Sequence, residues 1–349
     1  MAEYNKRMHE LDPLRRHLTK DELDQLESRP KTRLEKFLDV VICLLPIAAG
    51  CVALWEYNCV ANLPGNETGT YYNYFLLFLM GLAGLGFLAA MCGRKAFRWM
   101  RYKAPFYAFV FLVLAAYDWL TLKSGSLPLP YFPWLDQVIT AAVEDHAYLL
   151  DCTKNSLILL FTGYFSGVGA GLVTGIACGC NKKINYWIEP FTRLLGAIPS
   201  TTWLPVVMVL ASSLFKGSVF IIAMGVWYGV TISTVTGIVN IDRSYFEAAR
   251  TLGVKGFGLV TRVAVPSALP SILGGMTHSM STACTALIVA EMIGVESGLG
   301  WYIAWQKNWA RYGNMYAALV VICVMFVLVN VVLSAARRWL LRWQEGGPR

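Results

Sequence analysis

Eight stretches of the chain are almost wholly apolar, and each is long enough to cross a membrane as a helix. A helix needs about 20 mostly apolar residues to cross the ~30 Å hydrocarbon layer, where its backbone polar groups must be satisfied within the helix. The pattern therefore predicts an all-α integral membrane protein with about eight transmembrane helices. The predicted spans are 37–57, 72–92, 104–122, 157–180, 194–214, 219–240, 269–294 and 316–339.

The charged residues, only 15% of the chain, lie between the apolar stretches in a pattern that indicates orientation. The chain is 56% hydrophobic with a mean hydropathy of +0.49, so we expect membrane lipid to surround most of it. Its net charge of +8 comes from basic residues in alternate loops, whereas 58–71, 123–153 and 212–218 are poor in them. The positive-inside rule then predicts a multi-pass protein with both termini cytoplasmic, and no nucleic-acid partner is expected. The basic residues that mark these alternate loops lie within 94–103 and at Lys182, Lys183, Arg193, Arg243, Arg250, Lys255, Arg262, Arg337, Arg338 and Arg342.

The first 36 residues carry charges of both signs and lack the apolar core and cleavage site of a signal peptide. We therefore expect 1–36 to be a cytoplasmic amino-terminal segment. Thr19 and Glu22 form a capping-box pattern that predicts a short amphipathic helix within 13–36. This helix is either a solvated lead-in to the first span or a regulatory contact.

Glycine recurs at every fourth position along the predicted span 157–180. Residues four apart share one face of a helix, so the stripe predicts that another helix approaches closely there. The stripe indicates tight packing and says nothing by itself about chemistry. Its members are Gly163, Gly167, Gly171, Gly175 and Gly179.

The predicted span 194–214 contains Pro199 and Pro205 in the sequence GAIPSTTWLP. Proline inside a membrane helix frees carbonyl groups that need other partners, which favours a broken helix facing protein or a wet cavity. The segment either packs against other helices or lines a pathway with Ser200, Thr201 and Thr202.

The mildly basic segment EAARTLGVKGFGLVTRVAVPSALP lies between two predicted spans. Ser244 and Glu247 form a capping box, and Gly253 is a natural stop about two turns later. A second short helix is expected around 256–264, before Pro266 and Pro270 lead into the next span. A rigid helix–turn–helix with small side chains suits docking, although the capping role of Glu247 is equally compatible with a purely structural loop.

The same residues resemble a known motif. Glu247-Ala248-Ala249, then Gly253, then Val263-Ala264-Val265-Pro266 is similar to the EAA loop in permease subunits of binding-protein-dependent ABC importers, with valines replacing Ile and Leu. Similarity to the nitrate/sulfonate/taurine/bicarbonate branch extends from about 130 to 340. It includes the sequences WIEPFTRLLGAIPSTTWLPVVMVL, YFEAARTLGV, VPSALPSILGGM and VAEMIGVESGLGW.

The resemblance implies a type I ABC importer transmembrane domain with a six-helix core at 104–349 and an extra two-helix hairpin at 37–103. Its partners would be a second copy of the permease, two ATP-binding cassette subunits and an extracytoplasmic solute-binding protein, in the bacterial inner membrane. The loop at 241–268 would dock on the ATPase. The implied coupling residues are Phe246, Glu247, Ala248, Ala249, Arg250 and Gly253.

The chain itself contains no GKS or GKT sequence, and hence no P-loop for phosphates. We therefore expect a transport subunit that is not itself an enzyme and holds no cofactor. ATP and magnesium would be bound by the partner ATPase.

A polar face is predicted on the span 269–294. Small and hydroxyl residues on a membrane helix mark either helix packing or a neutral wall that binds a solute weakly enough to release it. The resemblance favours a small anion such as a sulfonate, taurine, nitrate or bicarbonate, without choosing among them. The face carries Gly274, His278, Ser281, Thr282 and Thr285.

The remaining polar residues of the spans have less specific interpretations. Glu291 and Asp118 lie near the outer ends of their helices, so interfacial or helix-pairing roles are expected. The nine cysteines show no metal-ligand spacing. Cys59 and Cys152 are both predicted on the outer side, where they would be either free thiols or a disulfide between the hairpin and the core.

Two other classes of protein are less consistent with the sequence. A secondary transporter is expected to show internal repeats and ionisable groups near the membrane midplane. An intramembrane enzyme needs a convergent acid, base or metal set, and the four scattered histidines do not supply one.

Overall fold

The computed structural model describes residues 33–66 and 68–342, so the helix expected within 13–36 lies almost wholly outside the described residues. Every regular element in the described part is helical, which confirms the predicted all-α class. The chain forms two compact units, Met1–Gly125 and Ser126–Arg349, and each is described by itself.

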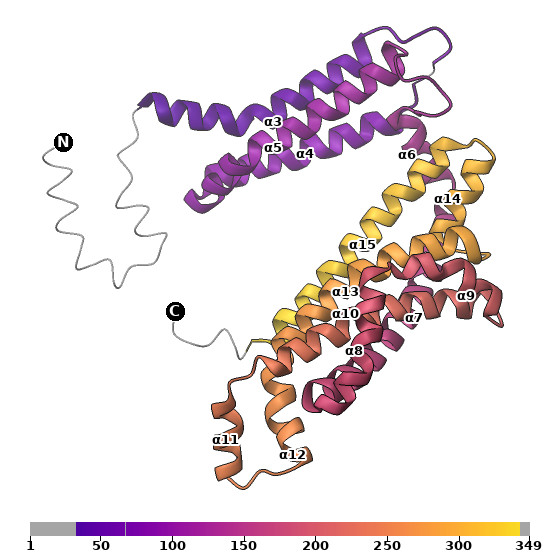
Figure 1. Ribbon diagram of the computed structural model, residues 1–349. Coiled ribbons are helices and arrows are strands. Elements are labelled where there is room, and N and C mark those ends of the chain that lie inside the picture. Colours follow the sequence, from indigo (N-terminus) through magenta and orange to yellow (C-terminus); the bar gives the residue numbers. More distant parts are fainter. Residues whose placement is uncertain (1–32, 67, 343–349) are drawn as a thin grey trace, which may run out of the picture. The chain divides into compact units, whose positions relative to one another are not determined.

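The first unit consists of three long helices that lie side by side (Figure 1). They are α3 (Arg33–Cys59), α4 (Tyr71–Cys92) and α5 (Arg94–Asp118), which continues into a π-helical turn, η2 (Trp119–Lys123). α3 and α4 approach closely at Gly50 of α3, where an added Cβ would lie 2.7 Å from Cγ of Met80 on α4.

The boundary between the units differs from the predicted one. The sequence places the division after residue 103, which assigns α5 to the carboxy-terminal core, but the contacts divide the chain after Gly125. The physical reason is that α5 packs mainly against α3 and α4. Pro128, Pro130 and Pro133 then lie in the irregular segment at the start of the second unit, before its first helix begins at Leu135.

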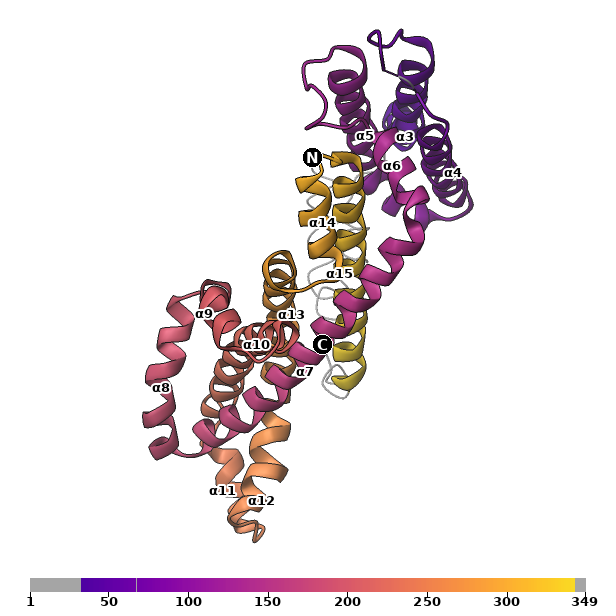
Figure 2. The ribbon, with the colours of Figure 1, turned by 90° about the vertical axis from the view of Figure 1, so that its right-hand side faces the viewer.

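The second unit is a bundle of helices that runs from α6 to α15 (Figures 1 and 2). The short helices α11 and α12 lie at one end of this unit, and α14 lies at the other. The elements are α6 (Leu135–Glu144), α7 (His146–Cys180), α8 (Lys182–Ala197), η3 (Ser200–Trp203), α9 (Leu204–Leu210), α10 (Leu214–Val239), α11 (Arg243–Thr251), α12 (Phe257–Leu259), η4 (Val260–Ala264), α13 (Val265–Gly294), α14 (Leu299–Asn308) and α15 (Tyr312–Leu340).

Seven helical segments of the described chain are long and apolar enough to cross a membrane, and α8 with η3–α9 forms an eighth segment bent by 91°. The predicted number of about eight is therefore confirmed. The predicted limits 194–214 are wrong, because α8 begins earlier, at Lys182, and ends at Ala197, where Ile198 adopts the extended backbone (ψ 118°) that the following Pro199 favours. The predicted break at the prolines is confirmed, and Pro205 occupies the first turn of α9, where its missing N–H costs nothing.

The glycine stripe of α7 forms a groove that receives α10. A Cβ added at Gly163 would lie 2.7 Å from Cβ of Ile222, and one at Gly167 would lie 2.5 Å from the carbonyl oxygen of Ala223. Val230, Thr234 and Ile238 fill the groove opposite Gly171, Gly175 and Gly179. The predicted close approach of a second helix is thus confirmed.

The register of this contact fixes the path of the chain. Residue numbers rise together along both helices, from Gly163 opposite Ile222 to Gly179 opposite Ile238, so α7 and α10 run in the same direction. The segment between them must therefore return the chain to the side on which α7 began. Consequently, the bent pair α8 and α9 acts as one crossing.

The glycine groove makes a direct prediction for paired substitutions on α7. Gly167→Ala should destabilise the protein by about 1–3 kcal/mol, because the new methyl group meets backbone atoms of α10 that cannot rotate away. Gly169→Ala, on the open side of the same helix, should be neutral or slightly stabilising, since alanine favours helix over glycine. Thermal unfolding of the two variants in detergent measures the difference. Equal stability of the two would contradict the packing account.

Candidate functional site

Helix α11 begins with a different cap from the predicted one. The Asp242 side chain accepts a hydrogen bond from the Ser244 N–H at 2.9 Å, and this bond holds the pKa of Asp242 below its usual range. Ser244 therefore lies inside the first turn, and Glu247 is the fifth helical residue. The predicted capping box of Ser244 and Glu247 is wrong, because Asp242 is the residue with the non-helical backbone that a cap requires.

Helix α11 ends as predicted at Gly253. The Gly253 N–H donates to the Arg250 carbonyl and the Val254 N–H donates to the Ala249 carbonyl, each at 3.0 Å. This pair of bonds is a Schellman motif, and it needs a left-handed residue, which Gly253 supplies with φ +84°. The chain then reverses direction at a second left-handed glycine, Gly256 (φ +56°).

The second half of the loop is continuous with the following membrane helix. The short helix predicted around 256–264 is present as α12 and the π-helical η4, but it is not separate, because both run directly into α13 as one helical stretch, Phe257–Gly294. Pro266 has no backbone N–H to donate, and it lies directly after the π-helical turn η4 without ending the stretch. The loop is therefore one short helix, a tight reversal and the start of a 38-residue helix.

The predicted coupling residues divide into two sets. Phe246 packs on a cluster formed by Ile238, Ala264, Ala268 and Ile272, where α10 ends and α13 begins, and Ala249 is buried. Glu247, Ala248 and Arg250 are exposed on the outer side of α11. The first set holds the helix in place, and the second forms a free surface.

The exposed surface of the loop also carries apolar side chains that sequence reasoning missed. Tyr245, Leu252 and Phe257, which lie in or next to α11 and α12, are all strongly exposed. Large apolar side chains that a soluble loop leaves exposed mark a contact surface for another protein. The sequence feature that could have identified these three residues is their position on either side of Gly253, in a loop that carries basic residues.

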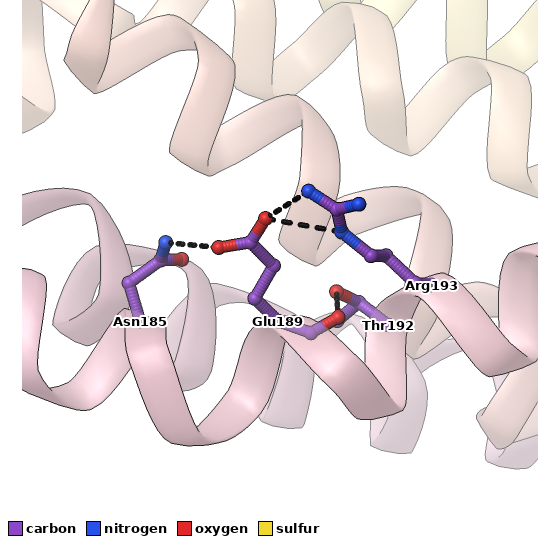
Figure 3. A network of polar contacts seen from close by, with 4 residues as sticks. All are labelled: Asn185, Glu189, Thr192 and Arg193. Carbon is purple, nitrogen blue, oxygen red and sulfur yellow. Dashed lines mark hydrogen bonds and ion pairs between the residues drawn. The ribbon is translucent and has the colours of Figure 1, made fainter.

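The helix before the proline break has a polar stripe (Figure 3). The Glu189 carboxylate accepts hydrogen bonds from Asn185 Nδ2 at 3.1 Å and from Arg193 Nη2 at 2.6 Å. Thr192 Oγ1 donates to the backbone carbonyl of Glu189 at 2.9 Å. Each partner lies within one turn of Glu189, so the stripe stabilises α8 up to the point where the helix bends.

A cavity of about 190 Å³ lies beside the bend, between the end of α8, α10 and α13. It brings together Ser200, His278 and Thr282, three of the residues that the sequence offers for a pathway wall. Thr201, Thr202, Ser281 and Thr285 do not line it. The lining residues are Leu195, Gly196, Pro199, Ser200, Met224, Gly225, Tyr228, Gly229, His278, Ser279 and Thr282, none of which is a carboxylate, lysine or arginine.

Two glycines of α10 open this cavity. A Cβ at Gly229 would collide with Oγ of Ser279, and one at Gly225 would lie 2.9 Å from Oγ of Ser200. Ser279 is 1% exposed, and its hydroxyl has no hydrogen-bond partner in the described chain. Sequence reasoning missed Ser279, Tyr228 and both glycines, although the spacing Gly225-x3-Gly229 was a visible sign of a second close face on α10.

Glu291 and Asp118 are the two acidic residues expected near the outer ends of their helices, in interfacial or helix-pairing roles. Glu291 is 1% exposed and pairs helices as predicted, because its Oε2 accepts the N–H of Gly300 in the first turn of α14 at 2.8 Å. Asp118 is also 1% exposed, which does not fit the expected interfacial role and leaves helix pairing as the other expected role. All nine cysteines lie in the described part and are free thiols, and Cys152 is buried inside α7.

Residues 167–345, just over half of the chain, match the family described as binding-protein-dependent transport system inner membrane component. The matched part contains the α11 loop and every residue that lines the cavity. The first unit lies outside it.

Curated proteins of similar sequence are permeases named for different solutes. The aliphatic sulfonates transport permease SsuC of Bacillus subtilis is 30% identical over 31% of this chain and 39% of its own length. The bicarbonate transport permease CmpB of Synechococcus elongatus is 26% identical over 34% of this chain and 42% of its own length. The choline transport permease OpuBD of Bacillus subtilis is 23% identical over 39% of this chain and 60% of its own length. The chain thus spans less than two thirds of each of these relatives.

Solved structures with a similar fold are ABC transporters. The methionine ABC transporter MetNI in an inward-facing conformation is 18% identical with a TM-score of 0.49, over 57% of this chain and 97% of that chain. An amino acid ABC transporter with histidines is 20% identical with a TM-score of 0.49, over 58% of this chain and 97% of that chain.

Proposed function

Because the chain belongs to the binding-protein-dependent transport system inner membrane component family, we propose that it is the permease subunit of an ATP-driven importer of a small oxyanion. The observation that carries this proposal is the exposed α11 loop, which is held rigidly at the end of the helix that lines the cavity. Its partners are two ATPase subunits on the cytoplasmic side, a second copy of the permease in the inner membrane and an extracytoplasmic solute-binding protein.

The α11 loop has the form of a docking element. Its outer surface combines Glu247 and Arg250 with the apolar Leu252 and Phe257, while Phe246 packs against residues of α10 and α13. Because the cap at Asp242 and the stop at Gly253 fix both ends of α11, a push on this surface moves the whole helix. ATP and magnesium are assigned to the partner subunits, since this chain has no P-loop sequence.

The continuous stretch Phe257–Gly294 gives the loop a mechanical connection to the cavity. Its first turn belongs to the loop, and His278, Ser279 and Thr282 lie about five turns further on. Displacement of α11 and α12 therefore shifts the wall of the cavity without an intervening flexible joint. This coupling of ATPase movement to alternating access is the mechanism that we propose.

The cavity favours a small oxyanion over a cation. Ser200, Tyr228, Ser279 and Thr282 offer hydroxyl donors, and no carboxylate or cage of several aromatic rings is present among the lining residues to hold a quaternary ammonium. The absence of lysine and arginine from the same wall suits transient binding, because hydrogen bonds to a fixed cation are stronger and would slow release. The relatives named for sulfonates and bicarbonate carry solutes of this class.

The docking role predicts different outcomes for two substitutions at one position. Gly253→Val should introduce about 1–2 kcal/mol of left-handed strain and so weaken retention of the ATPase by about 5–30-fold. Gly253→Asn should be tolerated, because asparagine adopts this conformation more readily. Co-purification of the ATPase and solute-stimulated ATP hydrolysis in vesicles measure both effects. A correctly inserted Gly253→Val protein that retains full coupling would contradict the proposal.

The pathway role predicts a change in transport without loss of assembly. Gly229→Ala places a methyl group against Ser279 and narrows the cavity, so uptake into vesicles should fall at least severalfold while the ATPase stays bound. The double variant Gly229→Ala with Ser279→Ala removes the colliding hydroxyl and serves as the control for strain. If Gly229→Ala transports normally, this cavity is not part of the pathway.

A further inference from the structure

Helix α8 supplies most of the membrane crossing between α7 and α10. The following helix α9 has seven residues and spans about 10 Å, too short for the ~30 Å hydrocarbon layer, whereas the 16 residues of α8 span about 24 Å. α8 begins directly after α7, whose Gly179 packs against Ile238 near the end of α10. The first turn of α8 therefore lies on the same side as the α11 loop, and its last turn lies at the cavity, which Leu195 and Gly196 line.

One face of α8 is apolar and open to the surroundings. Trp187, Phe191 and Leu194 follow one another at helical spacing along this face, and each is more than half exposed. Large apolar side chains on the outside of a crossing helix are suited to contact with membrane lipid. This face therefore turns away from any aqueous path.

The opposite face of α8 is polar and reaches the cavity (Figure 3). Asn185, Glu189 and Arg193 recur at four-residue spacing, and Gly196 lies three residues further along the same face. A Cβ added at Gly196 would collide with the hydroxyl group of Tyr228, one of the residues that line the cavity. The polar face thus extends from the side of the α11 loop to the cavity.

An ion pair lies on this polar face, well inside the crossing. Arg193, which the sequence assigns to a loop, follows Lys182 by eleven residues, about 16 Å along α8. Its Nε and Nη2 both donate to Oε1 of Glu189, at 3.1 and 2.6 Å, and the two side chains remain 79% and 42% exposed. Charged groups at this depth are costly against lipid, so the pair faces protein or a water-filled path.

The guanidinium group of Arg193 keeps donors that the ion pair does not use. Glu189 engages Nε and Nη2, while Nη1 has no acceptor in the described part of the chain. Guanidinium groups bind oxyanions through neighbouring N–H donors. The carboxylate of Glu189 offsets part of the positive charge, so an anion bound here is held weakly enough to leave.

We propose that Arg193 binds the oxyanion as it leaves the cavity, and that the polar face of α8 is the exit path toward the side of the α11 loop. This inference rests on the proposed function. The cavity wall itself contains no lysine or arginine. Arg193 lies about one turn from Gly196 at that wall, so it supplies the attraction that draws an anion out, and Glu189 prevents the anion from being retained.

Thiol labelling at single introduced cysteines tests whether this face is open to water. The full-length chain is studied in phosphatidylcholine nanodiscs, and peptide mass spectrometry reads each site separately from the nine native cysteines. Ala197→Cys, an exposed position one turn after Arg193, should react with a water-soluble methanethiosulfonate. Phe191→Cys, on the apolar face, should react at least about tenfold more slowly, because the reaction needs an ionised thiol. If Ala197→Cys is equally slow, lipid or a second copy of the chain covers the polar face, and the proposal is wrong.

The charge preference of the same labelling tests the role of Arg193. With Ala197→Cys, the rate for an anionic reagent relative to a cationic one should be about 2–5-fold higher than when Arg193→Gln is also present. Arg193→Lys should keep most of the preference, and Glu189→Gln should increase it by releasing the full charge of Arg193. Lys216→Gln, which removes an exposed cation at the start of α10, is the matched control and should change nothing. These variants are expected to fold, because the ion pair lies within one helix.

Sodium sulfate identifies the ligand as an oxyanion. At an ionic strength matched with sodium chloride, sulfate should slow anionic labelling of Ala197→Cys when Arg193 is present and not in Arg193→Gln. The same charge preference with and without Arg193, or no protection by sulfate, would show that the ion pair only stabilises α8. Loss of the sulfate effect in nanodiscs that contain phosphatidylglycerol would assign Arg193 to a lipid headgroup and also overturn the proposal. Because no measurement uses an ATPase or a transported solute, a failure here leaves the docking role of the α11 loop untouched.

Discussion

The close approach of α7 and α10 through the glycine groove is the constraint on which the second unit depends. Five glycines at four-residue spacing let α10 press its branched side chains against the backbone of α7. Lipid offers no hydrophobic drive for two apolar helices to associate, so this packing must come from shape. The contact also makes the two helices parallel, which forces α8 and α9 to return the chain within a single crossing. The proline break beside α10 is thus part of the topology and also forms one wall of the cavity.

The other face of α10 connects this scaffold to function. Gly225 and Gly229 leave room for Ser200 from the break and Ser279 from α13, so one helix is packed tightly on one side and opens a small polar cavity on the other. The third wall, α13, begins in the α11–α12 loop. A movement of the loop therefore reaches the cavity through a single helix. This continuity is the structural basis for the coupling that we propose.

Local signals in the sequence predicted what local interactions determine. The apolar spans, the glycine groove, the break at Pro199 and the helix stop at Gly253 each depend on residues within a few turns of one another. Features that depend on tertiary contacts were not predictable. Nothing in the sequence places Tyr228 of α10 and Ser279 of α13 at one cavity, because the two residues are brought together only by the packing of their helices. The assignment of α5 to the first unit likewise depends on its packing against α3 and α4. The cap of α11 was misplaced because two candidate residues, Asp242 and Ser244, lie next to the helix start, and only the backbone conformation distinguishes them.

The central claim is that the tip of the α11 loop is the surface on which a driving ATPase docks. A photo-crosslinking amino acid at Leu252, which is exposed at that tip, tests it directly when compared with the same probe at Trp305, which is exposed on α14 at the opposite end of the unit. The account predicts that the ATPase subunit is captured from Leu252 and not from Trp305, and that ATP binding changes the yield. Capture from both positions alike, or from neither when the complex is intact, would contradict it.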